Sequence, residues 1–303
     1  PGGEWSMALA ETFALPVDLM APLIEPATEL GPLLPEVAAR VGAHLTVTAP
    51  TIHDTAAAVL ATPAAGDDWC YLSSGTWSLL GIEVAAPILS PQALAANFTN
   101  ESGIDGTFRF LKNVMGLWLL QECARAWGSN DFAGLVGGAV GIDPWQSIVD
   151  PDHADFLAPA DMPAAIQVYC RRTGQPVPGE PAAIVRCIMD SLALKYALVL
   201  DQLEQTAHRN VRRIHVVGGG SQNHFLNQLT ADATGCEVVA GPVEATAIGN
   251  ALAQMIAGGQ LTDRHAAREL VDRSFELRRF SPRSAVPEAV RVRLRELTAQ
   301  EDV

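Results

Sequence analysis

Three short segments of the sequence combine residue types that can act on a phosphate. Residues 51–56 (Thr-Ile-His-Asp-Thr-Ala) place a carboxylate between an imidazole and a hydroxyl, residues 72–77 (Leu-Ser-Ser-Gly-Thr-Trp) form a hydroxyl-rich turn, and residues 214–223 contain three successive glycines. A carboxylate can orient a hydroxyl and accept its proton, and turns of small residues can present backbone N–H groups to an anion. The combination indicates transfer of a phosphoryl group.

The glycine segment is the most informative of the three. A predicted buried strand leads into Gly218, Gly219 and Gly220, which can adopt left-handed dihedral angles and leave no Cβ in the way of a ligand. We expect Ser221 to cap the helix that follows. An ordinary strand-to-helix turn would need only two glycines, so the pattern favours a nucleotide-binding loop. The sequence lacks G-x-x-x-x-G-K-[ST], which excludes a P-loop nucleoside triphosphatase.

Asp54 is the candidate general base. It follows a predicted strand and begins a predicted helix, so its alternative role is that of a helix-start carboxylate favoured by the helix dipole. His53 and Thr55 flank it, and the alanines at 56–58 leave room for a ligand. These neighbours favour the catalytic role. The turn at 73–76 is weaker evidence alone, because Ser and Gly are common in hairpin turns.

The elements that must position these segments alternate along the chain. A strand-like run at 43–49 precedes a helical pattern at 54–61, strands at 69–73 and 77–84 form a hairpin, and 97–100 and 107–110 predict a short strand pair. From Val114 the spacing becomes helical, with an apolar stripe at Leu117, Leu120, Ala124 and Trp127.

The second half of the sequence predicts mostly helices and then a layered α/β unit. Helices are expected at 131–138, 162–172 and 181–208, followed by a strand at 213–217, the glycine loop, a helix at 222–234, a strand at 237–240 and a helix at 245–257. Residues 281–303 are predicted to form a peripheral tail.

Composition limits the class of protein. The 303 residues are 49% hydrophobic and 18% charged, which is enough apolar material for one large or two smaller domains. A net charge of -14 would repel a nucleic-acid backbone, so nucleic acid is excluded as a partner. No run approaches the ~20 apolar residues that cross a bilayer, and no secretory signal is visible. We therefore expect a soluble, cytoplasmic protein without membrane contact.

The five cysteines do not form a metal site or a disulfide framework. They are scattered along the chain, and no CxxC or Cys/His cluster has zinc spacing. We expect buried thiols. Cys170 and Cys187, near the facing ends of two predicted helices, are the one pair that we suspect of bridging.

Taken together, these motifs resemble a known family. The segments HDTAAAVLA, YLSSGTWSLLG, NFTNESG, FRFLKNVMGLWLLQE, IHVVGGGSQNHFLNQLTADATG and AGPVEATAIGNA occur in the order and spacing of the FGGY carbohydrate kinases. Within that family they resemble the rhamnulokinases most closely. The resemblance extends from about residue 45 to about residue 260.

The resemblance implies a fold and a domain organisation. The fold would be an α/β, ribonuclease H-like domain of the actin/hexokinase ATPase type, with a mixed sheet flanked by helices. Residues 1–44 would be a connecting segment, 45–280 the C-terminal nucleotide-binding domain and 281–303 the tail. The family's first domain, with its phosphate loop and magnesium-organising carboxylate, has no counterpart in this sequence, so we expect a fragment.

The resemblance also implies residue roles. Asp54 matches the catalytic aspartate; His53, Asp54, Thr55 and Asn113 match sugar-binding positions; Thr76, Gln121 and Gly219 match ATP-contacting positions. Asn113 would begin a helix on which Gln121 lies two turns later, on nearly the same face. The alternatives are a helix cap for Asn113 and a solvated position for Gln121. ATP and Mg²⁺ are the expected cofactors, and the metal ligands stay unknown.

The implied reaction is ATP-dependent phosphorylation of a ketose, L-rhamnulose to L-rhamnulose 1-phosphate. Alternatives are a truncated, non-catalytic ATP- or sugar-binding module and a kinase for xylulose, fuculose or ribulose. We expect this chain alone to be inactive, because phosphoryl transfer needs groups on both sides of a cleft.

Overall fold

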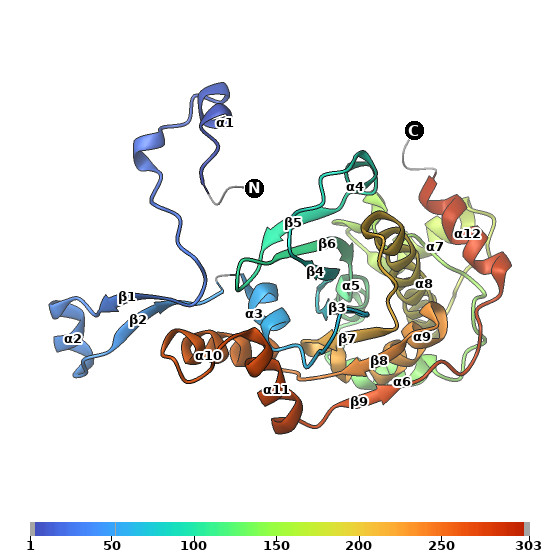
Figure 1. Ribbon diagram of the computed structural model, residues 1–303. Helices are drawn as coiled ribbons and strands as arrows, with labels where there is room; N and C mark the ends of the chain where they lie inside the picture. Colours follow the sequence, from blue (N-terminus) through green and yellow to red (C-terminus); the bar gives the residue numbers. More distant parts are fainter. Residues whose placement is uncertain (1–3, 52, 300–303) are drawn as a thin grey trace.

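A seven-stranded mixed sheet forms the centre of the structure, a computed structural model that describes residues 4–51 and 53–299 (Figure 1). The strand order is β5 (Thr99–Ser102), β6 (Phe108–Met115), β4 (Trp77–Val84), β3 (Trp69–Ser74), β7 (Arg213–Val217), β8 (Glu237–Ala240) and β9 (Arg278–Phe280). β3, β7 and β8 run parallel, and all the other neighbours pair antiparallel. This is the mixed sheet that the sequence predicts.

Alternation along the strands separates two cores. Side chains such as those of Cys70 and Leu72 pack on one face against α8 (Pro181–Ala207) and α9 (His224–Thr234). Trp69 and Tyr71 point to the other face, which α3 (Asp54–Leu60), α10 (Ala245–Ala257) and α11 (Arg264–Ser274) cover. Figure 1 shows these two helical layers on opposite sides of the sheet.

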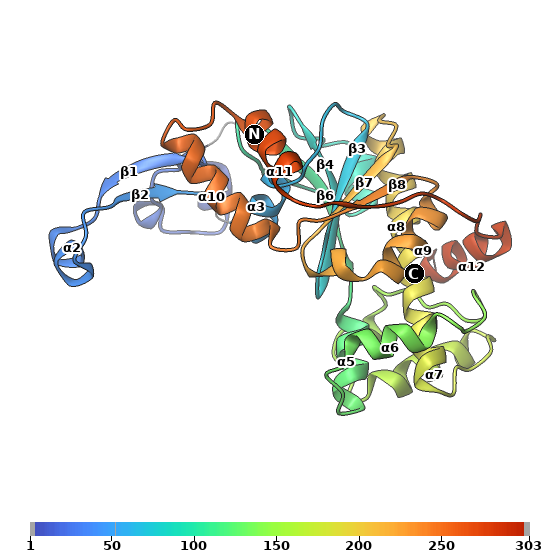
Figure 2. The same cartoon turned by 90° about the horizontal axis from the view of Figure 1, so that it is seen from below.

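The long helix α8 ties a helical lobe to the sheet. The lobe contains α5 (Trp118–Ala126), α6 (Phe132–Ala139), the 3-10 turn η2 (Ala154–Phe156) and α7 (Met162–Arg172). Figure 2 shows α5, α6 and α7 grouped beside one end of the sheet. Lys195 of α8 is buried and contacts Asp150 at 2.7 Å and Asp152 at 2.9 Å. Burial lowers the pKa of Lys195, but these two carboxylates raise it more, so the ammonium stays charged.

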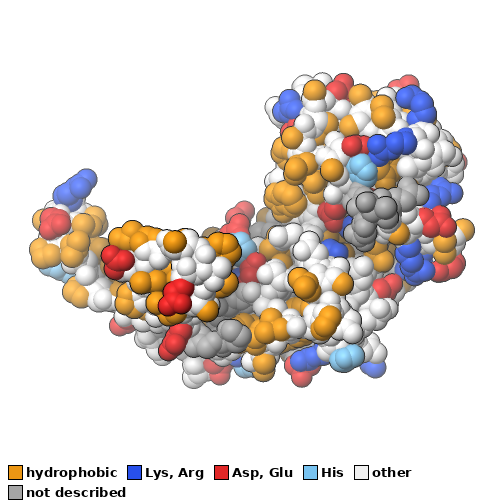
Figure 3. All heavy atoms as spheres, turned by 90° about the horizontal axis from the view of Figure 1, so that it is seen from above, with side chains coloured by type: hydrophobic (Ala, Val, Ile, Leu, Met, Phe, Trp, Pro, Cys, Tyr) orange, Lys and Arg blue, Asp and Glu red, His pale blue; other side chains and the backbone are white. Residues whose placement is uncertain are grey.

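Residues 4–51 form an arm that protrudes from this body. The arm contains α1 (Met7–Thr12), the 3-10 turn η1 (Val17–Leu19), β1 (Thr28–Pro32), α2 (Pro35–Val41) and β2 (Thr46–Ala49), and β1 pairs antiparallel with β2. It exposes many large hydrophobic side chains, among them Trp5, Phe13, Leu19 and Leu34. Hydrophobic side chains also gather over the arm in the space-filling view of Figure 3.

The structure corrects the prediction that a helix begins at Asn113. Asn113 lies in β6, which pairs with β4 from Trp77 opposite Met115 to Val84 opposite Phe108. This continuous ladder outweighs the helical spacing of the apolar residues, and the helix α5 starts only at Trp118. Gln121 is therefore on a different element from Asn113, and the two do not share a helix face.

Two further expectations concern α12 and the cysteines. The helix α12 (Glu288–Ala299), in the segment predicted as a peripheral tail, buries Val290, Leu294 and Leu297 in the same core as α8. The domain boundaries stay a prediction, and residues 1–3, 52 and 300–303 lie outside the described part of the chain. All five cysteines are buried and free, so Cys170 and Cys187 are not bridged.

A short helix, α4 (Pro91–Ala95), precedes β5.

His215 in β7 is a buried base without a polar partner. Its ring lies edge-on to Trp69, with centroids 5.8 Å apart, and neither ring nitrogen has a hydrogen-bond partner among the described residues. Burial lowers the pKa of His215 to about 3, helped by the positive charges of Arg213, Arg268 and Arg279. In the folded protein the ring therefore stays neutral until the pH approaches 3.

We predict that His215 destabilises the folded protein as the pH falls below the ordinary pKa of a histidine side chain. Between that value and about 3 the unfolded chain binds a proton that the folded chain does not, so the free energy of unfolding decreases as the pH falls. From pH 7.5 to 5 this residue alone should cost about 2 kcal/mol. Urea denaturation of His215→Phe should show a pH-dependent loss smaller by that amount, and identical pH profiles would contradict the prediction.

Candidate active site

The hairpin turn and the glycine loop meet at one edge of the sheet. β3 and β7 are adjacent and parallel, with Ser73 opposite Val217, so the segments that follow them emerge side by side. Gly218 adopts a left-handed φ of 83°, and a Cβ there would lie 3.2 Å from the Ser74 carbonyl oxygen. A Cβ on Gly220 would overlap the Ser74 side chain. Two of the three glycines are therefore needed for packing.

Gly219 is the glycine left for a ligand. Its φ is outside the left-handed region, and a Cβ would meet no atom within 4 Å. It begins a 3-10 turn, η3 (Gly219–Gln222), which replaces the predicted open loop. The prediction that Ser221 caps the next helix is wrong, because its hydroxyl donates to the Gly218 carbonyl oxygen at 2.6 Å and the Asn223 side chain caps α9 instead.

A cavity of about 790 Å³ opens beside this loop. Ser221 and Gln222 line one part of it, and Ile248, Phe275 and Leu277 supply an apolar wall. The remaining lining includes the segment 240–244, which follows β8 at the same edge of the sheet. A cavity with an apolar wall and nearby backbone N–H groups suits a flat heterocycle that carries phosphates.

Thr76 and Gln121 lie on the other side of the glycine loop. The backbone N–H groups of Leu117 and Trp118 donate to the carbonyl oxygens of Gly75 at 3.0 Å and Thr76 at 3.1 Å, which joins the start of α5 to the hairpin turn. Thr76 is exposed, and Gln121 is half-buried one turn into α5. The structure thus joins the hairpin turn that contains Thr76 to the start of the helix that contains Gln121.

Asp54 stands at the first turn of α3 with its two carboxylate oxygens in different environments. Oδ1 accepts from the Thr55 backbone N–H at 2.6 Å and from the Thr55 hydroxyl at 3.3 Å, and His53 Nε2 lies 3.2 Å away. Oδ2 has no hydrogen-bond partner among the described residues, and the side chain is 75% exposed. One oxygen is held in place and the other faces outward.

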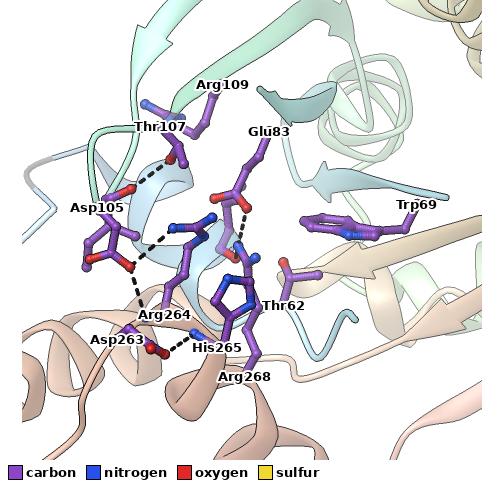
Figure 4. Close-up of polar contacts among 12 residues, drawn as sticks. Thr62, Trp69, Glu83, Asp105, Thr107, Arg109, Asp263, Arg264, His265 and Arg268 are labelled. Atoms are coloured by element: carbon purple, nitrogen blue, oxygen red, sulfur yellow. Dashed lines mark hydrogen bonds and ion pairs between the residues drawn. The ribbon is translucent and has the colours of Figure 1, made fainter. Parts of the chain in front are cut away.

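Close packing behind α3 determines where Asp54 sits. Gly249 of α10 lies so near that a Cβ would overlap the Ala57 backbone, and Thr246 donates to the Asp54 carbonyl oxygen at 3.2 Å. At the other end of α3, Arg268 of α11 donates to the Val59 carbonyl oxygen at 3.2 Å. Figure 4 shows Arg268 between this helix and Glu83 of β4, with which it forms a 2.7 Å ion pair.

Asn113 reaches the same side of the sheet from β6. It lies two residues from Leu111 and four from Arg109, so all three share the face that α3 covers. Arg109 is within 3.4 Å of His53, and Asn113 is about 13 Å further along the strand, towards the hairpin turn. The exposed Asn113 side chain therefore lies between the Asp54 group and the Thr76 group.

Sequence reasoning missed two charged residues in this site. Glu101 of β5 and Arg109 of β6 pair across the sheet and contact His53, at 3.4 Å from its Nδ1 in each case. Arg109 lies in the strand predicted at 107–110, whereas Glu101 lies one residue beyond the strand predicted at 97–100, and only the observed register places the two opposite each other. In the described part of the chain no group of three or more His, Cys, Asp or Glu residues could hold a metal ion. Among the described helices, none is long and apolar enough to cross a membrane.

Residues 70–258 match the C-terminal domain of the FGGY family of carbohydrate kinases. The chain is 47% identical over 258 residues to a rhamnulokinase of Bacteroides thetaiotaomicron, covering 85% of this chain and 53% of that protein. It is 45% identical over 280 residues to a rhamnulokinase of Pectobacterium carotovorum, covering 92% of this chain and 56% of that protein. The chain spans about half the length of these curated relatives.

Solved structures share the fold at low sequence identity. A xylulose kinase from Rhodospirillum rubrum superposes with a TM-score of 0.69 at 16% identity, covering 98% of this chain and 60% of that one. Plasmodium falciparum glycerol kinase with ADP superposes with a TM-score of 0.72 at 13% identity, covering 99% of this chain and 59% of that one. Together with the mixed sheet and its two helical layers, these neighbours confirm the predicted ribonuclease H-like fold.

The contact between Gly249 and Ala57 leads to a stability prediction. In Gly249→Val the new side chain must push α10 away from α3, so the free energy of unfolding should fall by about 1–3 kcal/mol. The control is Ala247→Val, at an exposed position of the same helix, which should cost less than about 1 kcal/mol. Equal losses in urea denaturation would contradict the importance of the contact.

Proposed function

The chain belongs to the FGGY family of carbohydrate kinases, and on this premise we propose that it serves the ATP-dependent phosphorylation of a ketose. L-rhamnulose, phosphorylated at its primary hydroxyl, is the proposed substrate, because the similar full-length proteins are rhamnulokinases. The fold alone is shared with kinases of other substrates, so xylulose, fuculose and ribulose are the alternative sugars. A cytoplasmic location stays a prediction.

The asymmetric environment of Asp54 is the observation that carries the proposal. Thr55 and His53 surround Oδ1, while the exposed Oδ2 is left to accept a hydrogen bond from the sugar hydroxyl. As the sugar oxygen bonds to the γ-phosphorus, the bond from that phosphorus to the β–γ bridging oxygen breaks, ADP leaves and Oδ2 takes the hydroxyl proton. General-base help of this kind contributes roughly 10²–10⁴-fold, and positioning of the reactants supplies the larger share.

The nucleotide would occupy the cavity beside the glycine loop. Ile248, Phe275 and Leu277 would contact the adenine ring, and the open space above Gly219 would admit the adenosine. The Thr76 hydroxyl and the neighbouring N–H groups would donate to phosphate oxygens, with Gln121 as a further donor. His53, Thr55 and Asn113 would line the sugar on the other side of the hairpin turn.

Magnesium would neutralise the phosphate charge during transfer, as in other phosphoryl transfers. The described residues contain no carboxylate cluster that fits it, so no ligand in this chain is assigned to the metal. The rival proposal is a non-catalytic ATP- or sugar-binding module. Domain closure around a complete site would exclude water that competes for the phosphoryl group.

The first test is Asp54→Asn in the full-length gene product. Asn keeps the shape but cannot accept the proton, so sugar phosphorylation should fall by about 10²-fold or more while ATP affinity stays within a few-fold. A coupled ADP-release assay and calorimetric ATP titration measure the two quantities. Asp143→Asn, an exposed carboxylate far along the chain, is the control. Turnover near wild type in Asp54→Asn would remove Asp54 from the base role.

Gly219→Val tests the nucleotide site. Because Gly219 has an ordinary φ and an open Cβ position, the variant should fold, and the added side chain should instead fill the approach of the ligand. ATP affinity should drop by about tenfold or more, equivalent to at least 1.4 kcal/mol, with sugar affinity little changed. Gly179→Val has the same open Cβ position elsewhere and serves as the control. Equal loss of both ligands would instead point to misfolding, and unchanged ATP affinity would place Gly219 outside the nucleotide site.

A further inference from the structure

We infer that Arg109 is a positioning residue for Asp54, acting through His53. The inference rests on the proposed function, in which Oδ2 of Asp54 accepts the proton of the sugar hydroxyl. Arg109 would fix the position of the proton on the His53 ring, and the ring would then hold Oδ1 and leave Oδ2 for the substrate.

Arg109 is buried and held rigidly. Its side chain is 3% exposed, its Nη2 forms an ion pair of 2.8 Å with Glu101 Oε2, and its Nε donates to the Ser102 carbonyl oxygen at 3.2 Å. Glu101 lies directly opposite Arg109 in the antiparallel register of β5 and β6. The guanidinium therefore has a fixed orientation, with Nη1 directed at Nδ1 of His53, 3.4 Å away.

A guanidinium has N–H groups only and cannot accept a hydrogen bond. When Arg109 Nη1 donates to His53, the Nδ1 atom must carry a lone pair, and the neutral ring then holds its proton on Nε2. Nε2 lies 3.2 Å from Asp54 Oδ1, which as a carboxylate oxygen can only accept. The two contacts agree on one tautomer, with Arg109 donating to His53 and His53 donating to Asp54.

Glu101 Oε2 is also 3.4 Å from Nδ1 and would favour a proton there. The guanidinium prevents this, because it already engages Oε2 at the shorter distance of 2.8 Å. Without Arg109, Glu101 Oε2 would be the nearest polar partner of Nδ1 and would favour the tautomer that carries its proton there. The lone pair of Nε2 would then face Asp54 Oδ1, so the ring could no longer hold that oxygen by a hydrogen bond.

The structure offers a matched control for Arg109. Arg268 is equally buried, at 4%, and forms a comparable ion pair with Glu83, which lies opposite Arg109 on the next strand. Figure 4 shows Arg109, Glu83 and Arg268 along this part of the sheet. Arg268 has no contact with His53 in the described part of the chain, so its loss removes an equally buried cation without removing a donor to the ring.

The first experiment records the ¹⁵N NMR signals of His53 in the 303-residue chain at pH 8. In the wild type, and in Arg268→Met, we expect an unprotonated Nδ1 and a protonated Nε2. Arg109→Met should protonate Nδ1, and Arg109→Lys, which still has a donor, should restore the wild-type pattern. A wild-type ring that carries its proton on Nδ1 would overturn the inference without any variant.

The second experiment measures kinetics in the full-length gene product. Arg109→Met should lower kcat by about 10–100-fold, the range found when a metal-bound His loses the partner that orients it, with the KM for ATP unchanged within about twofold. Arg109→Lys should recover kcat to within about threefold of wild type. A purely structural role would instead change kcat and KM together, and would do so equally in Arg268→Met.

Combination with Asp54→Asn separates this inference from the proposed function. If Asp54 is the base, Arg109→Met should cause no further loss of kcat in the Asp54→Asn background, because residues that act as a unit are not additive. An inactive Asp54→Asn with a wild-type kcat in folded Arg109→Met would overturn the role of Arg109 alone. Wild-type kcat in Asp54→Asn would overturn the proposed function itself.

Discussion

The parallel pairing of β3 with β7 is the constraint on which the site depends. It makes the hairpin turn and the glycine loop leave the sheet next to each other. Because Gly220 has no side chain, the loop can lie directly against Ser74, where any Cβ would overlap the serine. The start of α5 is then fixed by hydrogen bonds to the same turn. Three segments far apart in the sequence therefore meet at one edge, because two strands are neighbours and because glycine is the only residue that fits.

A second constraint acts on the face of the sheet that α3, α10 and α11 cover, where small residues and buried charges supplement the apolar core. Gly249 lets α10 approach the backbone of α3, and Arg268 joins the far end of α3 to Glu83. Arg109 and Glu101 form a similar pair in the next part of the sheet. Buried ion pairs add little net stability relative to apolar packing, but breaking one leaves an expensive unpaired charge. Such pairs suit a region where orientation matters more than packing energy.

The sequence predicted much of this fold where local signals and tertiary structure agree. The strands at 213–217 and 237–240 and the helices at 162–172 and 245–257 are confirmed at those bounds. It failed at Asn113, where pairing with β4 outweighs helical spacing, and at Ser221, where the turn tightens into a 3-10 helix and Asn223 becomes the cap. The contacts of His53 with Glu101 and Arg109 depend on strand register, which no local pattern specifies. The roles of the individual site residues stay predictions.

Two successive residues of α10 contact different parts of the molecule. Ile248 lines the large cavity, and Gly249, the next residue, touches the backbone of α3. A molecule that fills the cavity and moves α10 therefore changes the packing of α10 on α3, whose first turn carries Asp54. Thermodynamic linkage then applies in both directions: whatever factor occupancy of the cavity imposes on affinity at Asp54, a molecule at Asp54 imposes the same factor on affinity for the cavity. Cooperativity between the two ligands would thus follow from one glycine, without any change in the sheet.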